Sequence, residues 1–285
     1  MPGRTHAPTY PQGVALPFIP SDAALLAFQA GTVLAPRALP RPARLERVSG
    51  RGWALVPIAS IVLVVFAIRF LSGTATALTY LALVAVPLLA AAALGWAARG
   101  SRPPAALAAI PLFLLAWLSH RTLAGEAAGA LLAALSCVTL GVLLGAVTPP
   151  AWLKAGIVLM AGADSWLVVS DLLQAPNAML IAAHPAAGLP QLQSVIFGSV
   201  SMGYGDMFVA ALLGAVTARS ARRQGAAALL TLAIAAVFDL LFLFLSELPA
   251  TVPVALALIA IEGSERLSAG RRPSMRAAAT PRRAR

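Results

Sequence analysis

Residues 195–218 read VIFGSVSMGYGDMFVAALLGAVTA, a stretch in which Asp206 is the one charged side chain. An apolar run of about 20 residues is long enough to cross the hydrocarbon core of a bilayer as a helix. An ionisable group in that environment is costly unless it is paired, protonated or facing a wet cavity, so it marks a candidate functional site. The stretch therefore predicts a membrane-spanning helix that carries one functional carboxyl group.

The composition of the whole chain agrees with a membrane protein. Of its 285 residues 60% are hydrophobic and only 11% charged, and the mean hydropathy is +0.85. These values exclude a soluble globular enzyme, and a lone cysteine, Cys137, excludes a disulfide scaffold. We expect an all-α polytopic membrane protein with about eight transmembrane helices, within a range of seven to nine. The expected spans are 53–71, 75–98, 104–119, 125–146, 151–174, 195–218, 225–246 and 249–262.

These spans divide the chain into four parts. The expected parts are an Arg- and Pro-rich N-terminal segment (1–52), an N-terminal half of four helices (53–146), a second half that carries the aspartates (151–262) and a disordered basic tail (263–285). Within the first part, residues 12–34 are mildly apolar but are interrupted by Pro17, Pro20, Asp22 and Gln29. We expect a re-entrant or surface segment there rather than a full span.

The net charge of +11 follows the predicted topology. Two loops and the start of the fifth span place their basic residues on one side of the membrane, and these residues are Arg99, Arg102, Lys154, Arg219, Arg222 and Arg223. The opposite side receives Arg69 and Arg121. The positive-inside rule then predicts that both termini are cytoplasmic. Since no aromatic or glycine pattern interleaves the arginines, we expect no nucleic-acid partner.

Four aspartates lie in the second half of the chain: Asp164, Asp171, Asp206 and Asp239. The midpoints of the fifth and sixth spans fall near residues 163 and 206, so Asp164 and Asp206 are expected at the same depth on neighbouring helices. Asp171 lies on nearly the same helical face as Asp164 and is the alternative partner, whereas Asp239 is off-centre in the seventh span.

Two facing carboxyl groups cannot both ionise cheaply, which leaves an acid beside a base. Such a pair suits hydrolysis of a peptide bond, and it equally suits a carrier of protons or cations.

The residues around Asp206 distinguish these alternatives. Gly203-Tyr204-Gly205-Asp206 resembles the GxGD motif of the intramembrane aspartyl proteases, the presenilin and signal peptide peptidase family. The segment Ala163-Asp164-Ser165-Trp166-Leu167-Val168 resembles the first-aspartate motif of that family. Pro249-Ala250-Thr251 is similar to its Pro-Ala-Leu motif, with Thr251 in place of leucine. Ala163 stands where the family has tyrosine, and we expect four spans before the first aspartate where the family has five.

The resemblance implies a presenilin-like helix bundle with Asp164 and Asp206 as the catalytic dyad and without a cofactor or metal. Gly203, Tyr204 and Gly205 would allow close approach of a substrate, and Pro249, Ala250 and Thr251 would shape the site. Residues 178–182 would pair with an extended substrate. The substrates would be single-span membrane proteins or remnant signal peptides, and the protein would lie in a bacterial or archaeal plasma membrane.

A second GxGD enzyme, the type IV prepilin peptidase, is the main alternative. Residues 202–206 resemble its second-aspartate motif, and Asp171 followed by Pro176-Asn177 resembles its first. That enzyme has lysine where this chain has Phe208, and it needs a whole span between the two motifs, for which residues 178–194 are too short. A non-proteolytic carrier, and an inactive relative that only binds transmembrane helices, also remain open.

Overall fold

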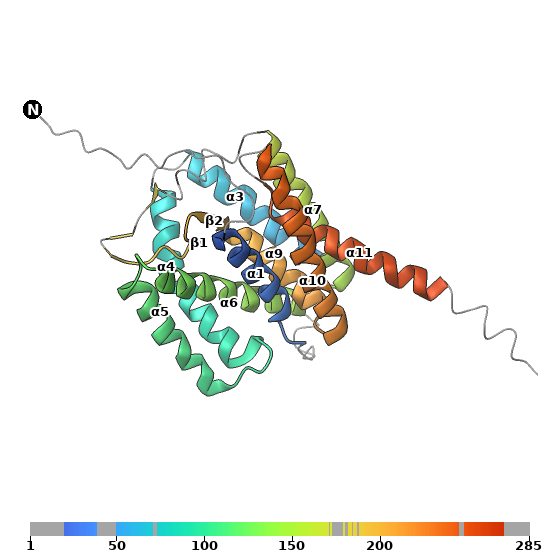
Figure 1. The fold of residues 1–285 in the computed structure, drawn as a ribbon, viewed down its shortest axis with the longest axis horizontal. Helices are drawn as coiled ribbons and strands as arrows, with labels where there is room; N and C mark the ends of the chain where they lie inside the picture. The colour runs from blue at the N-terminus through green and yellow to red at the C-terminus, as the bar shows by residue number, and fades with distance from the viewer. Residues whose placement is uncertain are drawn as a thin grey trace, which may run out of the picture.

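The computed structural model describes residues 20–38, 50–70, 73–170, 172, 179, 182–183, 185–186, 188–244 and 248–270. In this part of the chain nine apolar helices pack into one bundle (Figure 1). They are α1 (Pro20–Leu34), α3 (Val56–Phe70), α4 (Thr74–Ala92), α5 (Ala109–Leu118), α6 (Leu123–Val147), α7 (Pro150–Val169), α9 (Tyr204–Thr217), α10 (Ala221–Phe238) and α11 (Thr251–Gly270). The expectation of a helical, membrane-type protein is confirmed at this level.

Shorter elements extend or connect these helices. Four of them are single helical turns: η1 (Arg51–Leu55) before α3, the π-helical η2 (Ala93–Ala97) after α4, η3 (Pro103–Ala108) before α5 and η4 (Asp239–Leu243) after α10. Two strands, β1 (Ser194–Phe197) and β2 (Val200–Gly203), form an antiparallel hairpin in which Ser194 pairs with Gly203.

The described residues contain four helices that are long and apolar enough to cross a membrane. These are Thr74–Ala97, Leu123–Val147, Pro150–Val169 and Ala221–Leu243, and shorter apolar helices occupy Pro103–Leu118 and Tyr204–Thr217. The structure therefore supports a helical membrane protein, while eight complete crossings are not confirmed.

The first half of the expected span 195–218 is a β-hairpin, so the helix predicted for residues 195–203 was wrong. The β-branched residues Val195, Ile196 and Val200 favour extended backbone, and Gly198 takes a left-handed φ of 61° at the turn. Helix α9 begins only at Tyr204. Asp206 consequently lies in the first turn of its helix and not at the middle of a span.

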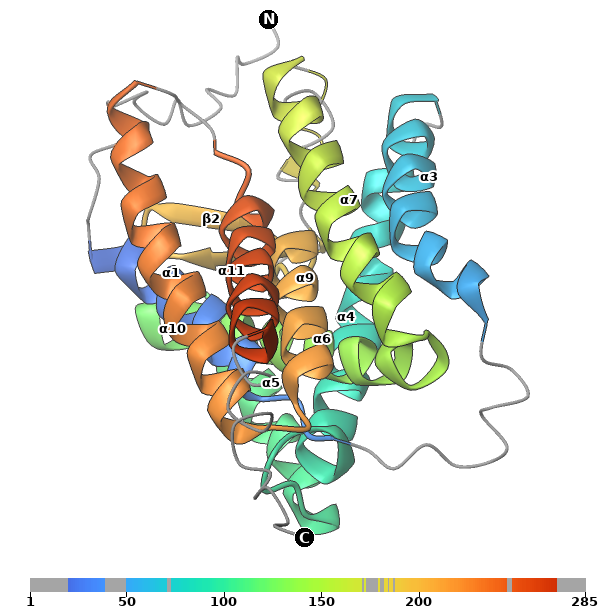
Figure 2. The same ribbon diagram turned by 90° about the vertical axis from the view of Figure 1, so that its right-hand side faces the viewer.

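Helix α1 is too short to count among the helices that could cross a membrane, as expected for a re-entrant or surface segment, and it packs on the bundle by one face while Ala23, Ala27, Gly31 and Leu34 on the other face are exposed. It packs against α6, α9 and α10 (Figure 2), and its Leu25 and Val33 are buried. Proline at its first position and Asp22 in its first turn are compatible with a helix start. Five apolar helices thus precede α7 in the described part of the chain.

Small residues allow the central helices to pack closely. A Cβ atom added to Gly141 of α6 would lie 2.9 Å from the backbone of Ala211 in α9. A Cβ atom on Gly214 of α9 would lie 2.4 Å from the carbonyl oxygen of Val33 in α1. Close backbone contact of this kind is typical of membrane helices, where lipid does not drive helices together.

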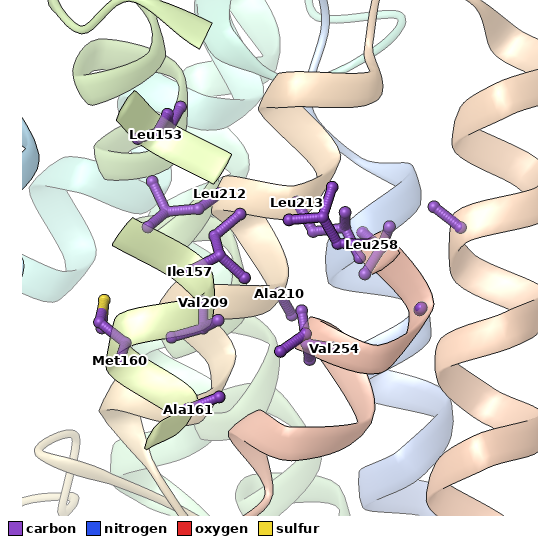
Figure 3. Close-up of a cluster of buried hydrophobic side chains, with 14 of the residues drawn as sticks. Leu153, Ile157, Met160, Ala161, Val209, Ala210, Leu212, Leu213, Val254 and Leu258 are labelled. Carbon is purple, nitrogen blue, oxygen red and sulfur yellow. The ribbon is translucent and has the colours of Figure 1, made fainter. Parts of the chain in front are cut away.

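Next to these close contacts α7, α9 and α11 enclose a cluster of buried apolar side chains (Figure 3). The labelled members are Leu153, Ile157, Met160, Ala161, Val209, Ala210, Leu212, Leu213, Val254 and Leu258. The cluster holds together the three helices that carry the residues of the site described below.

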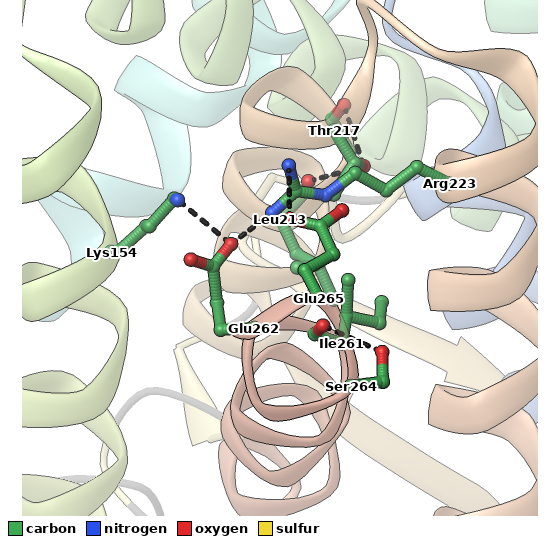
Figure 4. A network of polar contacts seen from close by, with 9 residues as sticks. Lys154, Leu213, Thr217, Arg223, Ile261, Glu262, Ser264 and Glu265 are labelled. Atoms are coloured by element: carbon green, nitrogen blue, oxygen red, sulfur yellow. Dashed lines mark hydrogen bonds and ion pairs between the residues drawn. The ribbon is translucent and has the colours of Figure 1, made fainter. Parts of the chain in front are cut away.

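Ion pairs join α7, α10 and α11 on one side of this core (Figure 4). Glu262 of α11 accepts Lys154 Nζ at 2.7 Å and also pairs with Arg223 of α10, which lies 3.2 Å from Glu265. Helix α11 continues past these residues to Gly270, so the expectation of disorder was wrong for residues 263–270. Residues 271–285 lie outside the described part of the chain.

The basic loops expected on one side of the membrane are also together in space. The Arg99 side chain donates to the carbonyl of Ala218 at 3.1 Å and to the side chain of Gln224. The backbone N–H of Arg37 donates to the carbonyl of Ala97 at 3.0 Å. We call Arg37, Arg99, Lys154 and Arg223 the positively charged end of the bundle; it includes the C-terminal end of α9, whereas the β-hairpin precedes the N-terminal end of that helix.

Candidate active site

Asp206 lies where β2 gives way to α9. Its Oδ2 accepts the backbone N–H of Gly203 at 3.1 Å, which closes the first turn of the helix. The positive end of the helix dipole also favours negative charge at this position. A Cβ atom on Gly203 would lie 2.9 Å from Asp206 Oδ2, whereas one on Gly205 would meet nothing within 4 Å. Gly203 therefore makes room for the carboxyl group itself, and the space at Gly205 is open.

Asp164 comes from the last two turns of α7 and meets the start of α11. Its Oδ2 accepts the hydroxyl of Thr251 at 2.6 Å, and the backbone N–H of Thr251 also donates to the carboxyl group. Thr251 is the first residue of α11 and is buried. A second helix N-terminus is thus directed at the candidate pair.

The two aspartates are 42 positions apart in the sequence but lie near each other in the bundle. Their carboxyl groups interact electrostatically and both are partly buried. In the part of the chain that the structure describes, the ion pairs of Lys and Arg side chains involve Glu262 and Glu265, and neither aspartate has a cationic partner. The positive ends of α9 and α11 are the groups that stabilise negative charge here.

Tyr204 of the GxGD motif is attached to α6. Its hydroxyl lies 2.7 Å from Ser136 Oγ, and its carbonyl accepts the thiol of Cys137 at 3.7 Å. The sequence had suggested that Tyr204 shapes the substrate site. The structure shows a residue that fixes the N-terminus of α9, and with it Asp206, against the longest helix of the bundle.

The turn before α11 is held by a residue that the sequence analysis treated only as an interruption. Gln29 of α1 donates through Nε2 to the carbonyl of Ala250 at 2.9 Å. Of the three residues Pro249, Ala250 and Thr251, Thr251 is the one that contacts Asp164. The partner of Gln29 is 221 positions away, so no local pattern could have revealed it.

The remaining aspartates are not part of the pair formed by Asp164 and Asp206. Asp239, at the end of α10, is hydrogen-bonded to Asp22 at the start of α1, and both are buried. Asp171 lies outside the described residues, so its role as the alternative first aspartate stays a prediction. Of the segment 178–182, only Met179 and Ala182 are described, and both are helical rather than extended.

Searches for related proteins give no further identification. No protein-family model, no curated protein and no solved structure matches this chain. Among the described residues no group of three or more His, Cys, Asp or Glu side chains could hold a metal ion. The chemistry of the site therefore has to be argued from its geometry.

Proposed function

We propose that this chain is an intramembrane aspartyl protease of the presenilin and signal peptide peptidase type, with Asp164 and Asp206 as its dyad. The observation that carries the proposal is the convergence of two carboxyl groups with the N-termini of α9 and α11. Hydrolysis of a peptide bond needs one group that accepts a proton from water and one that donates a proton to the carbonyl oxygen. Two interacting carboxyl groups that share one proton supply both.

The reaction would proceed through a tetrahedral intermediate. A water molecule between the carboxyl groups would lose a proton to the ionised aspartate while its oxygen attacks the scissile carbonyl carbon. The protonated aspartate would give its proton to the carbonyl oxygen. The aspartate that received the proton from water would then protonate the leaving nitrogen as the C–N bond breaks, while the other aspartate takes a proton back from a hydroxyl of the intermediate. The donors from Thr251 and Gly203 would keep the two carboxyl groups oriented through these transfers.

Two features of the fold support the presenilin-like alternative over the prepilin peptidase. The five described helices before α7 match the number that the family has before its first aspartate, once α1 is included. Thr251 of the Pro249-Ala250-Thr251 turn contacts Asp164. This turn has no counterpart in the prepilin peptidase motif.

The β-hairpin is the better candidate for binding an extended substrate than residues 178–182. It ends at Gly203, one residue before α9 and three before Asp206. A substrate strand that adds to this sheet would expose its amide bonds beside the dyad. The open space at Gly205 is consistent with close approach of a substrate backbone there.

Helix α1 also modifies the proposed orientation. Ser21, at its start, lies against Gly198 in the turn of the hairpin, whereas Arg37 follows its end at the positively charged end of the bundle. With the positively charged end in the cytoplasm, the start of α1 at Pro20 would lie toward the outer side of the membrane, and the end of α11 would lie toward the cytoplasm. The substrate class would still be single-span proteins or signal peptides with cytoplasmic N-termini.

The decisive experiment compares three Asp→Asn variants in proteoliposomes that contain a panel of single-span substrates. Asp164→Asn and Asp206→Asn should each lower cleavage at least about a thousandfold, because the dyad acts as a unit. Asp239→Asn is the matched control, since it changes a buried aspartate of the same bundle outside the pair, and it should retain cleavage. Cleavage that survives Asp206→Asn refutes the proposal. Proton or cation flux that depends on Asp164, without cleavage, would identify a carrier instead.

A further inference from the structure

We propose that Gln29 of α1 is a positioning residue of the active centre, which orients Asp164 through the peptide group between Ala250 and Thr251. The inference rests on the proposed function for its catalytic consequence. Its structural basis is a single chain of hydrogen bonds that joins the first helix of the protein to the first aspartate of the dyad.

The chain of bonds passes through one rigid unit. Gln29 Nε2 donates to the carbonyl oxygen of Ala250 at 2.9 Å, and the N–H of Thr251 donates to the carboxyl group of Asp164. This carbonyl and this N–H belong to the same peptide group, which is planar. Holding the oxygen therefore fixes the direction in which the N–H points, and hydrogen bonds in such a series polarise one another.

The hydroxyl of Thr251 depends on the same geometry. Its Oγ1 lies 2.6 Å from Asp164 Oδ2, so a small rotation at the start of α11 would change both donations to the carboxyl group together. Without Gln29, the carbonyl of Ala250 would lose its donor from α1, and the turn before α11 would have more freedom. Asp164 would then sample orientations that do not face Asp206.

Burial makes a purely stabilising role a poor explanation for Gln29. Gln29 is 1% exposed, and its Oε1 has no hydrogen-bond partner among the residues that the structure describes. A buried amide with an unsatisfied oxygen costs free energy, so an apolar residue of similar size would serve packing better. The donation to Ala250 is the interaction that an apolar residue could not supply.

Helix α1 is itself held firmly on both sides of Gln29. At one end of α1 Asp22 is hydrogen-bonded to Asp239 of η4. At its other end Gln224 Nε2 donates to the carbonyls of Val33 and Pro36 at 2.8 and 2.9 Å. Gln29 therefore lies between two further attachments of α1, and neither of them involves the turn before α11.

The test compares two buried glutamines that both attach α1. Gln29→Met removes the donor to Ala250, and Gln29→Glu is a second variant of the same size that replaces the donating amide nitrogen by oxygen. Gln224→Met is the matched control, because it loosens the other end of α1 without touching the turn before α11. Each full-length variant is studied in proteoliposomes for cleavage and, by residue-resolved hydrogen exchange, for protection of the Thr251 amide.

Gln29→Met should lower kcat at least about tenfold with KM within about threefold, and should speed exchange of the Thr251 amide at least about tenfold. Gln224→Met should leave both within about threefold. In a Thr251→Val background, the effect of Gln29→Met on kcat should shrink to less than about threefold, because the two residues act along one path.

Unchanged Thr251 exchange in both folded Gln29 variants would overturn the inference, and so would faster exchange with unchanged kcat. If wild type cleaves no substrate while Gln29→Met still speeds exchange selectively, the proposed protease function fails but the structural coupling between Gln29 and the Asp164 contact stands. The two failures are therefore distinguishable.

Discussion

Replacing Thr251 by valine tests the most direct contact of the candidate dyad. Valine has nearly the shape of threonine but cannot donate, so it removes the 2.6 Å hydrogen bond to Asp164 Oδ2 and leaves the backbone donation in place. A hydrogen bond to a charged group contributes about 1.5–3 kcal/mol. If the bond is made fully in the transition state, kcat/KM should fall by about ten- to 150-fold, since each 1.4 kcal/mol is a factor of ten.

The assay is cleavage of one reconstituted substrate, with kcat and KM measured separately. Thr251→Ser keeps the hydroxyl and should stay within about threefold of wild type. Thr231→Val is the matched control, because Thr231 is also buried but its Oγ1 has no hydrogen-bond partner. That substitution should leave cleavage unchanged and should be neutral or stabilising. Thr251→Val with wild-type kcat/KM would refute the idea that this donor orients Asp164.

Two further predictions concern the GxGD motif. Gly203→Ala should lower kcat at least about tenfold, because its Cβ would lie 2.9 Å from Asp206 Oδ2 and displace the carboxyl group. A Cβ atom on Gly205 would meet no atom within 4 Å, so Gly205→Ala should leave the melting temperature unchanged. If a substrate backbone passes this position, the same variant should raise KM. Equal loss of stability in Gly203→Ala and Gly205→Ala would contradict the difference in free space between the two glycines. Tyr204→Phe breaks the 2.7 Å bond to Ser136 and should cost about 0.5–1.5 kcal/mol of unfolding free energy in a detergent melt, and Ser136→Ala should add nothing to it.

The candidate pair could be predicted from the sequence because a charged residue in an apolar stretch is recognisable without knowledge of the helix boundaries. Aspartates in an apolar span are costly wherever the helix begins, so Asp164 and Asp206 stood out without a correct helix boundary. The argument from matching span midpoints was nevertheless wrong for Asp206, which lies in the first turn of α9. The residues meet because α9 starts late, at the level of the last two turns of α7.

The hairpin could not be recognised from hydropathy. An apolar run reads alike as a buried strand or as part of a helix, and periodicity does not separate the two. The β-branched residues on both sides of Gly198-Ser199 were the available signal, since two such runs around a glycine-containing pair are typical of a hairpin. The length of the whole apolar run outweighed that local signal.

Helix α1 was expected only as a re-entrant or surface segment, for a different reason. Asp22 and Gln29 reduced its hydropathy, and hydropathy measures the cost of exposing a side chain to lipid. Both residues face protein instead: Asp22 meets Asp239, and Gln29 meets the carbonyl of Ala250. They are seven positions apart, which places them on nearly the same face of a helix.

Polar groups on the buried face of a helix in a membrane protein need partners on neighbouring elements. For Asp22 and Gln29 those partners come from segments about 220 residues later in the chain. Asp22 and Gln29, which make α1 unsuitable as a lipid-facing span, therefore attach it to the end of α10 and to the turn before α11. Sequence alone gives the two polar residues but not their partners. Their partners make α1 the support for the first aspartate.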